Sequence, residues 1–197
     1  MYKILSKRLL ANNIYLMDVE APRVAKSCHP GQFVIVKLDE KGERIPLTIC
    51  DYDSNKGLVT IVFQTLGKST KEMALLDEGD YFQDFVGPLG RPSEMVEESI
   101  EELKNKRIIF IAGGVGTAPV YPQVKWLHER GIDCDVIVGA KNKELIILEE
   151  EMTAVAGNLY ICTDDGSYGF KGMVTEKLKD LVLNEGKHYD RAIAIGP

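Results

Sequence analysis

The sequence predicts a two-domain protein, an antiparallel β-barrel followed by an α/β domain with a parallel sheet. In the first ninety residues, short apolar runs alternate with turn residues, a pattern typical of a closed or nearly closed barrel. From residue 107 onward, apolar strands alternate with helical segments, which indicates a parallel sheet. We therefore expect a barrel domain over 1–92, a linker helix over 93–106 and an α/β domain over 107–197.

Each barrel strand is expected where β-branched and aromatic residues gather between turns. Strands are predicted at 2–11, 14–20, 33–38, 46–52, 58–65 and 81–86. One segment breaks this pattern. Residues 69–76 combine helix formers with a possible Ser or Thr cap, so a short helix is predicted between two barrel strands.

The second half opens with an unbroken apolar run at 107–112, which suits a strand covered on both faces. Helices are then predicted at 119–130, 148–155 and 174–184, and strands at 134–139, 159–163 and 191–195. The last strand ends at Gly196-Pro197 without a covering helix. We therefore expect the α/β domain to be incomplete at its C-terminal end.

Composition excludes several classes of function. The 197 residues carry 24 Lys and Arg against 30 Asp and Glu, a net charge of −6, and 45% are apolar. An acidic chain without a basic run is a poor nucleic-acid binder. No apolar stretch approaches the roughly 20 residues that span a bilayer, and the N-terminus lacks the apolar core of a signal peptide. We expect a cytoplasmic protein with no membrane and no nucleic-acid partner.

The strongest candidate site is the loop I-A-G-G-V-G-T-A-P at 111–119, between a predicted strand and a helix. Glycines allow a sharp turn and a close approach to the backbone amides. Thr117 is expected to cap the helix, and the helix N-terminus would then face a phosphate. The alternative is a tight turn without a ligand, because the G-G-x-G spacing differs from the Rossmann fingerprint.

Three further segments could line a ligand site. Arg44, Pro46 and Thr48 open a strand, although they also suit an edge strand that begins at its proline. Residues 64–71 lead through Gly67 into hydroxyls at a helix start, either an anion cradle with nearby lysines or an ordinary cap. The glycine-rich loop 163–172 follows a strand of the α/β half, where ligand crevices form.

The other reactive side chains favour structural roles. Cys28, Cys50, Cys134 and Cys162 lie too far apart for a metal site, and we interpret them as buried hydrophobic residues. No metal site is expected. The histidines (His29, His128 and His188) are interpreted as surface or structural residues. A carboxylate run (Glu97, Glu98, Glu101 and Glu102) is expected on a solvated helix face, and Glu149, Glu150 and Glu151 in a helical first turn.

Taken together, the motifs resemble the ferredoxin reductase superfamily. In chain order they are P-L-T-I, G-K-S-T, G-P-L-G, G-G-V-G-T-A-P and T-D-D-G-S-Y-G. The chain is similar to two related flavoprotein subunits. One is the small subunit of NADH-dependent reduced ferredoxin:NADP oxidoreductase, also called sulfide dehydrogenase, which the segment 44–53 resembles more. The other is the electron-transfer subunit of dihydroorotate dehydrogenase.

The resemblance implies FAD on the barrel and NAD(H) on the α/β domain. It assigns Arg44, Pro46, Leu47 and Thr48 to the flavin, with the Thr48 hydroxyl near the reactive flavin nitrogen in a catalytic role. The resemblance places the flavin pyrophosphate against a segment that comprises Gly67, Lys68, Ser69 and Thr70. It places the nicotinamide nucleotide against a segment that comprises Gly113, Gly114, Gly116 and Thr117, with Asp164 and Gly166 as a wall.

The chain departs from the family pattern in three places. Arg44 lies one residue further from Thr48 than the family's arginine does, and Leu47 replaces an aromatic residue of many relatives. The cysteine-rich loop that holds a [2Fe–2S] cluster in full-length relatives is absent from this sequence. Asp164 and Asp165 favour NADH over NADPH, although Lys141, Lys143 and Lys171 lie within possible reach.

The implied function is electron transfer between NAD(H) and a larger flavin or iron–sulfur partner subunit through FAD. The reductase small subunit is the main interpretation, and the dihydroorotate dehydrogenase subunit in pyrimidine biosynthesis is the alternative within the enzyme class. Two other classes stay open: a nucleotide-sensing module without electron transfer, and a structural subunit whose barrel serves assembly.

Overall fold

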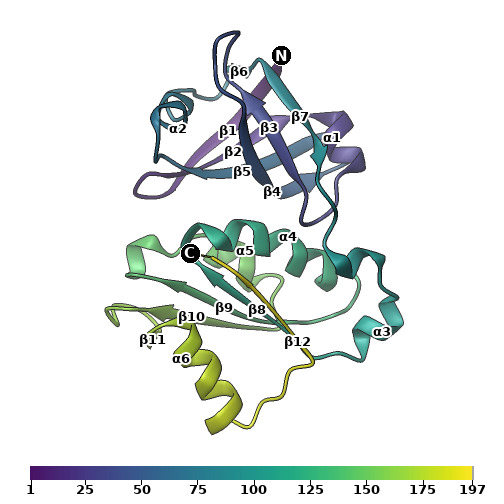
Figure 1. Ribbon diagram of the computed structural model, residues 1–197, viewed down its shortest axis with the longest axis vertical. Coiled ribbons are helices and arrows are strands. Elements are labelled where there is room, and N and C mark those ends of the chain that lie inside the picture. The colour runs from purple at the N-terminus through teal and green to yellow at the C-terminus, as the bar shows by residue number, and fades with distance from the viewer. Residues whose placement is uncertain (197) are drawn as a thin grey trace. The chain divides into compact units, whose positions relative to one another are not determined.

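The computed structural model describes residues 1–196, which form two compact units. The first comprises Met1–Val96 and the second begins at Glu97 (Figure 1). The division therefore falls within the segment 93–106. No helix in the described part of the chain is both long and apolar enough to span a membrane.

The first unit is a nearly closed antiparallel barrel, as the sequence predicts, and it has seven strands where the sequence predicts six. The sheet order is β6-β1-β2-β5-β4-β3-β7. The strands are β1 (Tyr2–Ala11), β2 (Ile14–Glu20), β3 (Phe33–Lys37), β4 (Ile45–Asp53), β5 (Leu58–Gln64), β6 (Tyr81–Phe82) and β7 (Asp84–Leu89). Strands β6 and β7 lie at opposite ends of this order, yet only Gln83 separates them in the chain.

Side chains that point inward from the strands fill the core of the barrel. Fully buried apolar residues come from every strand, among them Ile4, Met17, Val34, Ile49, Ile61, Phe82 and Phe85. The predicted strand at 81–86 is two strands, because the backbone at Gln83 turns to donate a hydrogen bond to the Lys37 carbonyl at 2.9 Å.

Two helices accompany the barrel. Helix α1 (Pro22–Ser27) was not predicted, since six residues are too few to show a helical period. It begins at a proline, which suits the first helical turn, and it buries Val24 and Ala25. Helix α2 (Lys68–Met73) begins one residue before the predicted segment 69–76 and ends three residues earlier.

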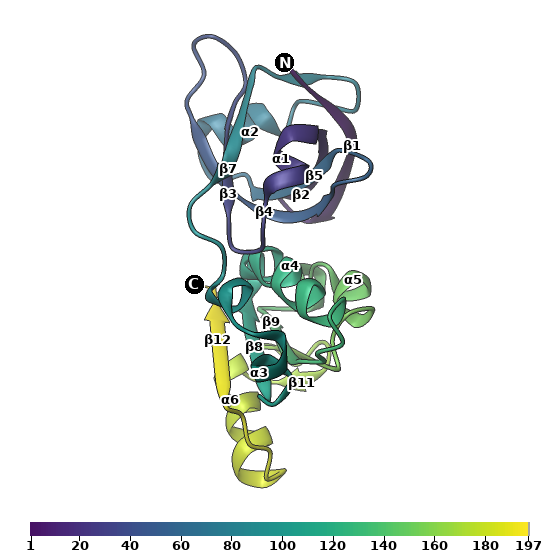
Figure 2. The ribbon, with the colours of Figure 1, turned by 90° about the vertical axis from the view of Figure 1, so that its right-hand side faces the viewer.

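The second unit is a five-stranded parallel sheet with the order β11-β10-β9-β8-β12. Its strands are β8 (Ile108–Gly113), β9 (Asp135–Ala140), β10 (Asn158–Thr163), β11 (Phe170–Lys171) and β12 (Arg191–Ile195). Helices α4 (Thr117–His128) and α5 (Glu149–Thr153) cover one face, and α6 (Val174–Lys179) covers the other (Figures 1 and 2). The shorter elements are η1 (Glu94–Glu97), α3 (Ile100–Lys104), η2 (Gly114–Gly116), η3 (Lys143–Leu145) and the π-helical turn η4 (Asp180–Asn184).

Three local expectations for this unit need correction. Helix α4 begins at Thr117 rather than Pro119, because the turn η2 leads directly into it. Thr117 does not cap the helix; its hydroxyl donates to the Gly114 carbonyl at 2.9 Å. Strand β11 was missed, since its two residues carry no periodic signal. The three acids at 149–151 do lie in the first turn of α5, as expected.

Glu98 is not on a solvated face, contrary to the sequence-based expectation. Its side chain is 22% exposed and accepts hydrogen bonds from Arg191 at 2.5 Å and Lys106 at 2.8 Å. These two cations, Arg191 foremost, lower the pKa of the Glu98 carboxyl. Glu98 therefore anchors the beginning of β12 through Arg191, the first residue of that strand, which lies 93 residues further along the chain.

Candidate cofactor sites

Strand β4 changes partner halfway along its length. In the described structure, Ile45–Thr48 pair with β3 alone, whereas the second half pairs with β5. Pro46 is tolerated inside a sheet because the strand is paired on only one side there. The alternative of an edge strand therefore holds for the first half of β4 but not for the whole strand. One backbone edge of this segment is left without a sheet partner.

The register with β3 separates the side chains of this segment into two faces. Leu47 pairs with Val34, which is fully buried, and packs against the barrel core. Thr48 pairs with Phe33, so these two side chains share the opposite face. Pro46 is exposed on the same face as Thr48, because alternate residues of a strand point the same way. Phe33 was missed because only the strand register reveals it beside Thr48.

Two segments assigned to the flavin meet in the barrel. The Ser69 hydroxyl donates to the Glu43 carboxylate, which connects the start of α2 to the residue before Arg44. Arg44 itself lies 3.4 Å from the Asp84 carboxylate and is 59% exposed. The resemblance predicts that these segments share one site, and the structure brings them into contact.

The other residues around Gly67 are engaged locally. The Thr70 hydroxyl accepts hydrogen bonds from the amides of Gly67 at 3.1 Å and Leu66 at 3.0 Å, which is the behaviour of a helix cap. Lys68 is largely exposed and lies 3.7 Å from the Glu72 carboxylate. No atom lies within 4 Å of the Cβ that a side chain at Gly67 would carry.

The glycine loop of the second unit is built by close packing. A Cβ at Gly116 would lie 2.3 Å from the Ile195 carbonyl oxygen, and one at Gly196 would lie 2.9 Å from the Gly113 amide nitrogen. The end of β12 therefore packs on the loop. Gly114 differs, because its φ of +52° favours glycine, while nothing lies within 4 Å of its missing Cβ.

These features fit a dinucleotide. Gly113 pairs with Gly139, so the loop lies at the carboxyl edge of the parallel sheet, where α/β folds bind nucleotides. The backbone at Gly114 is open to an approaching group. The Asn142 side-chain oxygen, which follows β9 at the same edge, is shielded from water and finds no hydrogen-bond partner among residues 1–196. That oxygen could accept a hydrogen bond from a ligand.

The loop that carries Asp164 and Gly166 follows β10 and is tied to the loop after β9. The Asp164 amide donates to the Ala140 carbonyl at 3.1 Å, and the Lys143 amide donates to the Ser167 hydroxyl at 2.9 Å. The Asp165 carboxylate accepts hydrogen bonds from Ser167, which lower its pKa. Asp164 is exposed, whereas Asp165 is engaged within its own loop.

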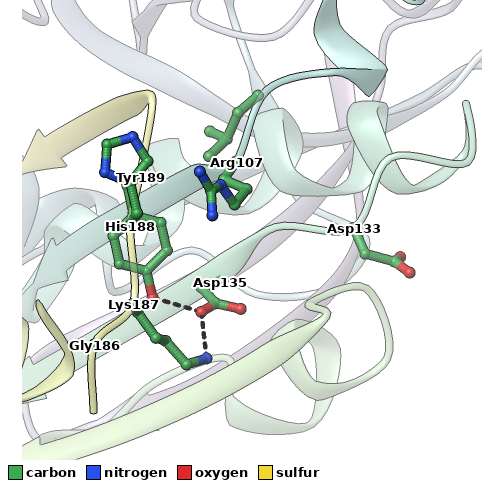
Figure 3. Close-up of a pocket in the computed structure, with 8 residues that line it drawn as sticks. Arg107, Asp133, Asp135, Gly186, Lys187, His188 and Tyr189 are labelled. Atoms are coloured by element: carbon green, nitrogen blue, oxygen red, sulfur yellow. Dashed lines mark hydrogen bonds and ion pairs between the residues drawn. The ribbon is translucent and has the colours of Figure 1, made fainter.

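A cavity of about 280 Å³, which no sequence pattern indicates, lies at the opposite, amino edge of the sheet (Figure 3). The Asp135 carboxylate there accepts hydrogen bonds from Tyr189 at 2.6 Å, Lys187 at 2.9 Å and Asn158 at 2.7 Å. Burial would raise the pKa of Asp135, but these donors outweigh it and lower the pKa. No local sequence pattern could reveal this cluster, since the three donors lie 23 to 54 positions from Asp135 in the chain.

The cysteines and histidines occupy structural positions. All four cysteines are buried, as predicted, and they form no disulfide within residues 1–196. Burial raises the pKa of the Cys28 and Cys162 thiols to about 11. His29, His128 and His188 are exposed. Within residues 1–196 there is no cluster of three or more His, Cys, Asp or Glu side chains able to hold a metal.

Comparison with solved structures defines the class of this fold. No family model matches the chain. The structure of an NADH-dependent reduced ferredoxin-NADP oxidoreductase, solved in a study of flavin-based electron bifurcation, superimposes with a TM-score of 0.88 at 37% identity. The superposition covers 100% of this chain and 68% of the oxidoreductase chain. A ferredoxin reductase of carbazole 1,9a-dioxygenase shares the fold at 13% identity, with a TM-score of 0.76. The chain therefore has a ferredoxin-reductase-like fold with FAD- and NAD-type domains.

Curated relatives define the family within that class. An uncharacterized protein in the adh 3' region of Clostridium beijerinckii is 67% identical over 100% of this chain and 67% of its own length. The dihydroorotate dehydrogenase B electron transfer subunit homolog of Thermotoga maritima is 40% identical over 99% of the chain. The electron transfer subunit of Fusobacterium nucleatum is 31% identical over 95% of the chain and 71% of its own length.

The chain belongs to the family of dihydroorotate dehydrogenase B electron-transfer subunits. It spans about two thirds of the length of these relatives, for example 66% of the Thermotoga protein.

Proposed function

We propose that this chain binds FAD and NAD(H) and passes electrons between NAD(H) and a partner subunit. The single observation that carries the proposal is the 37% identity, over the whole chain, to the oxidoreductase structure of the same fold. FAD, when bound, supplies the conversion between hydride transfer and single-electron transfer. The chain supplies binding, orientation and electrostatics.

The barrel residues have distinct parts in this proposal. Thr48 presents its hydroxyl on the outer face beside Phe33, where it would hydrogen-bond a reactive flavin nitrogen. Pro46 would lie along the flavin ring. The Leu47 side chain packs on the core, so the flavin would meet its backbone. The flavin pyrophosphate would lie against Arg44 and against the start of α2, which comprises Gly67, Lys68, Ser69 and Thr70. Glu43 would then release Ser69, and Asp84 would release Arg44.

The α/β unit would hold the dinucleotide along the carboxyl edge of its sheet. The turn that would receive the pyrophosphate consists of Gly113, Gly114, Gly116 and Thr117. A ligand can approach its backbone at Gly114, where nothing lies within 4 Å of the missing Cβ. Asp164 and Gly166 would form a wall. Asp164 is exposed and could accept hydrogen bonds from ribose hydroxyls, which favours NADH. Reduction of the flavin by NADPH at lower concentration than by NADH would overturn that preference.

Two partner subunits are compatible with the proposal: the dihydroorotate dehydrogenase B type and the reduced ferredoxin-NADP oxidoreductase type. The names of the curated relatives favour the first type. Several curated relatives, at 30–33% identity, are dihydroorotate dehydrogenase B electron transfer subunits. The second candidate is a partner of the reduced ferredoxin-NADP oxidoreductase type, which the structural match at 37% identity favours. Co-purification followed by assays with dihydroorotate, and with ferredoxin plus NADP, would distinguish them.

The first experiment is a visible spectrum of the purified chain, recorded before and after anaerobic NADH. We expect flavin bands that bleach. Flavin that NADH cannot reduce would favour a nucleotide-sensing module. A protein that takes up no added FAD would favour a structural role, and would overturn the proposal.

A substitution at Thr48 tests its role in the same assay. Thr48→Val deletes a hydroxyl and retains the side-chain shape, so we expect normal FAD content and up to about tenfold slower reduction, the value of one hydrogen bond. Thr175→Val, an exposed position on α6, is the matched control. An unchanged rate in Thr48→Val would mean that this hydroxyl does not face the flavin.

A further inference from the structure

Every side chain that the proposed function turns toward the flavin pyrophosphate is already paired within the barrel unit. The Thr70 hydroxyl is occupied by two backbone amides. Three groups are left to meet a phosphate, and each contacts one carboxylate. The pairs are Arg44 with Asp84 at 3.4 Å, Lys68 with Glu72 at 3.7 Å, and Ser69 with Glu43. Together these pairs carry two positive and three negative charges, a net charge of −1.

Glu43 differs from the other two acids, because its partner is a neutral hydroxyl. Asp84 and Glu72 each lie beside a cation, which offsets their charge. The contact with Ser69 satisfies a hydrogen bond of the Glu43 carboxylate but does not neutralise it. Of the three carboxylates, Glu43 is therefore the one whose charge a bound phosphate would meet most directly.

The loop between β3 and β4 holds Glu43 at this place. Within it, the Asp39 carboxylate accepts a hydrogen bond from the Lys41 amide at 2.8 Å, and the Asp39 carbonyl accepts one from the Gly42 amide at 3.2 Å. Strand β4 begins two residues after Glu43 and is paired with β3 from its first residue. A fixed turn on one side and a paired strand on the other keep the Glu43 charge near Ser69.

A carboxylate beside a phosphate site discriminates by the charge of the phosphate. A phosphate monoester carries between about 1.5 and 2 negative charges at neutral pH, whereas each phosphorus of a pyrophosphate diester carries one. Two like unit charges about 4 Å apart in water repel strongly enough to weaken binding about fivefold. The carboxylate therefore weakens the binding of a monoester more than the binding of a diester, which is selection by repulsion of the wrong ligand.

We propose that Glu43 is a specificity-determining residue that favours FAD over FMN. In both flavins the first phosphate follows the same ribityl chain, so it would reach the same place beside Ser69. That phosphate is a monoester in FMN and part of a pyrophosphate diester in FAD. The inference rests on the proposed function, which assigns the segment around Ser69 to the flavin pyrophosphate.

Calorimetric titration of the flavin-free chain with FAD and with FMN, at low salt, tests the proposal. Glu43→Gln removes the charge and keeps an oxygen that can accept the Ser69 hydrogen bond. We expect this variant to bind FMN about 20-fold and FAD about fivefold more tightly than the wild type does, so the preference for FAD narrows about fourfold. The adenosine half of FAD is common to both proteins and cancels from this comparison. Salt at about 1 M should abolish the difference between the proteins, because it screens exposed charges.

Two further variants separate the charge of Glu43 from other effects. Glu43→Asp keeps the charge and should retain the wild-type preference. Glu40→Gln is the matched control, since it changes the net charge equally at an exposed position of the same loop. It should leave the preference unchanged.

The outcomes distinguish failure of the inference from failure of the proposed function. Equal tightening of both flavins in Glu43→Gln, no change in either, or the same narrowing in Glu40→Gln would overturn the role of Glu43 alone. If the wild type bound neither flavin, the proposed function would fail as well. If Glu43→Gln did not fold, Glu43→Ala, which also removes the charge, should narrow the preference to the same extent.

Discussion

The two edges of the parallel sheet are built in opposite ways. At the amino edge, the Asp135 carboxylate has three donors within 2.9 Å, and Lys187 is shared between Asp135 and Tyr160. At the carboxyl edge, Gly114 is open and the Asn142 oxygen finds no donor in the part of the chain that the structure describes. One edge satisfies its own polar groups, whereas the other leaves groups for a ligand.

This difference is why we place the proposed dinucleotide site at the carboxyl edge and not at the cavity. The cavity of about 280 Å³ lies at the amino edge, where the half-buried charges of Asp135 and Lys187 already pair with each other. Paired charges and hydrogen-bonded donors stabilise a fold but offer little to a ligand. The carboxyl edge has the glycine loop, and backbone amides near it can approach phosphate closely.

The largest expected effect is at the carboxyl edge. Gly116→Ala places a Cβ against the Ile195 carbonyl oxygen, so the loop must shift away from β12. A displacement of about 1 Å can slow a reaction about 100-fold, and we expect kcat/KM for flavin reduction by NADH to fall by about that factor. FAD content should not change. Thr175→Ala, at an exposed position on α6, is the control. Loss of FAD in Gly116→Ala would contradict the assignment of the two cofactors to separate units.

An intermediate effect is expected at the amino edge, on stability rather than binding. Asp135→Asn leaves the Lys187 ammonium without its carboxylate, and we expect the free energy of unfolding to fall by about 2–3 kcal/mol at pH 7. The folded-state pKa of Asp135 is lowered, so its stabilisation is present above the ordinary pKa of 3.8 and is lost as the pH falls below it.

Urea unfolding of both proteins at pH 7 and pH 3 checks this prediction. The difference in stability should shrink at the lower pH, and affinity for NADH at pH 7 should be unchanged. Asp133→Asn, whose side chain is 71% exposed, should have almost no effect. A stability difference independent of pH would mean that the charge of Asp135 is not what stabilises this edge.

The smallest effect is expected at Glu98, which anchors the beginning of β12 through Arg191 and Lys106. Its side chain is partly exposed, so Glu98→Gln should lower the free energy of unfolding by about 1 kcal/mol. Thermal unfolding at neutral pH measures this change. Glu97→Gln, an exposed neighbour, serves as the comparison. If the two variants were equally stable, the Glu98 ion pairs would contribute nothing measurable.

Sequence reasoning found the fold class and most strands, because alternation of apolar residues and the turns between them are local. Strands β1, β2 and β12 match the predicted bounds. It missed α1 and β11, which are too short to show a period, and it placed Glu98 in solvent. The glycine loop and the loop 163–172 were predicted, but Phe33 and Asn142 were not, since their positions depend on strand register and loop packing.

Local sequence is enough to predict an antiparallel barrel followed by a parallel sheet, with a glycine turn after the first strand of that sheet. Such features are encoded within about ten neighbouring residues, through side-chain period and the conformational freedom of glycine. Only the tertiary structure decided that β4 is paired on one side at Pro46, that β12 packs on Gly116, and that Asp135 gathers its three donors. These contacts join residues far apart in the chain, so they depend on sheet order and register rather than on local sequence.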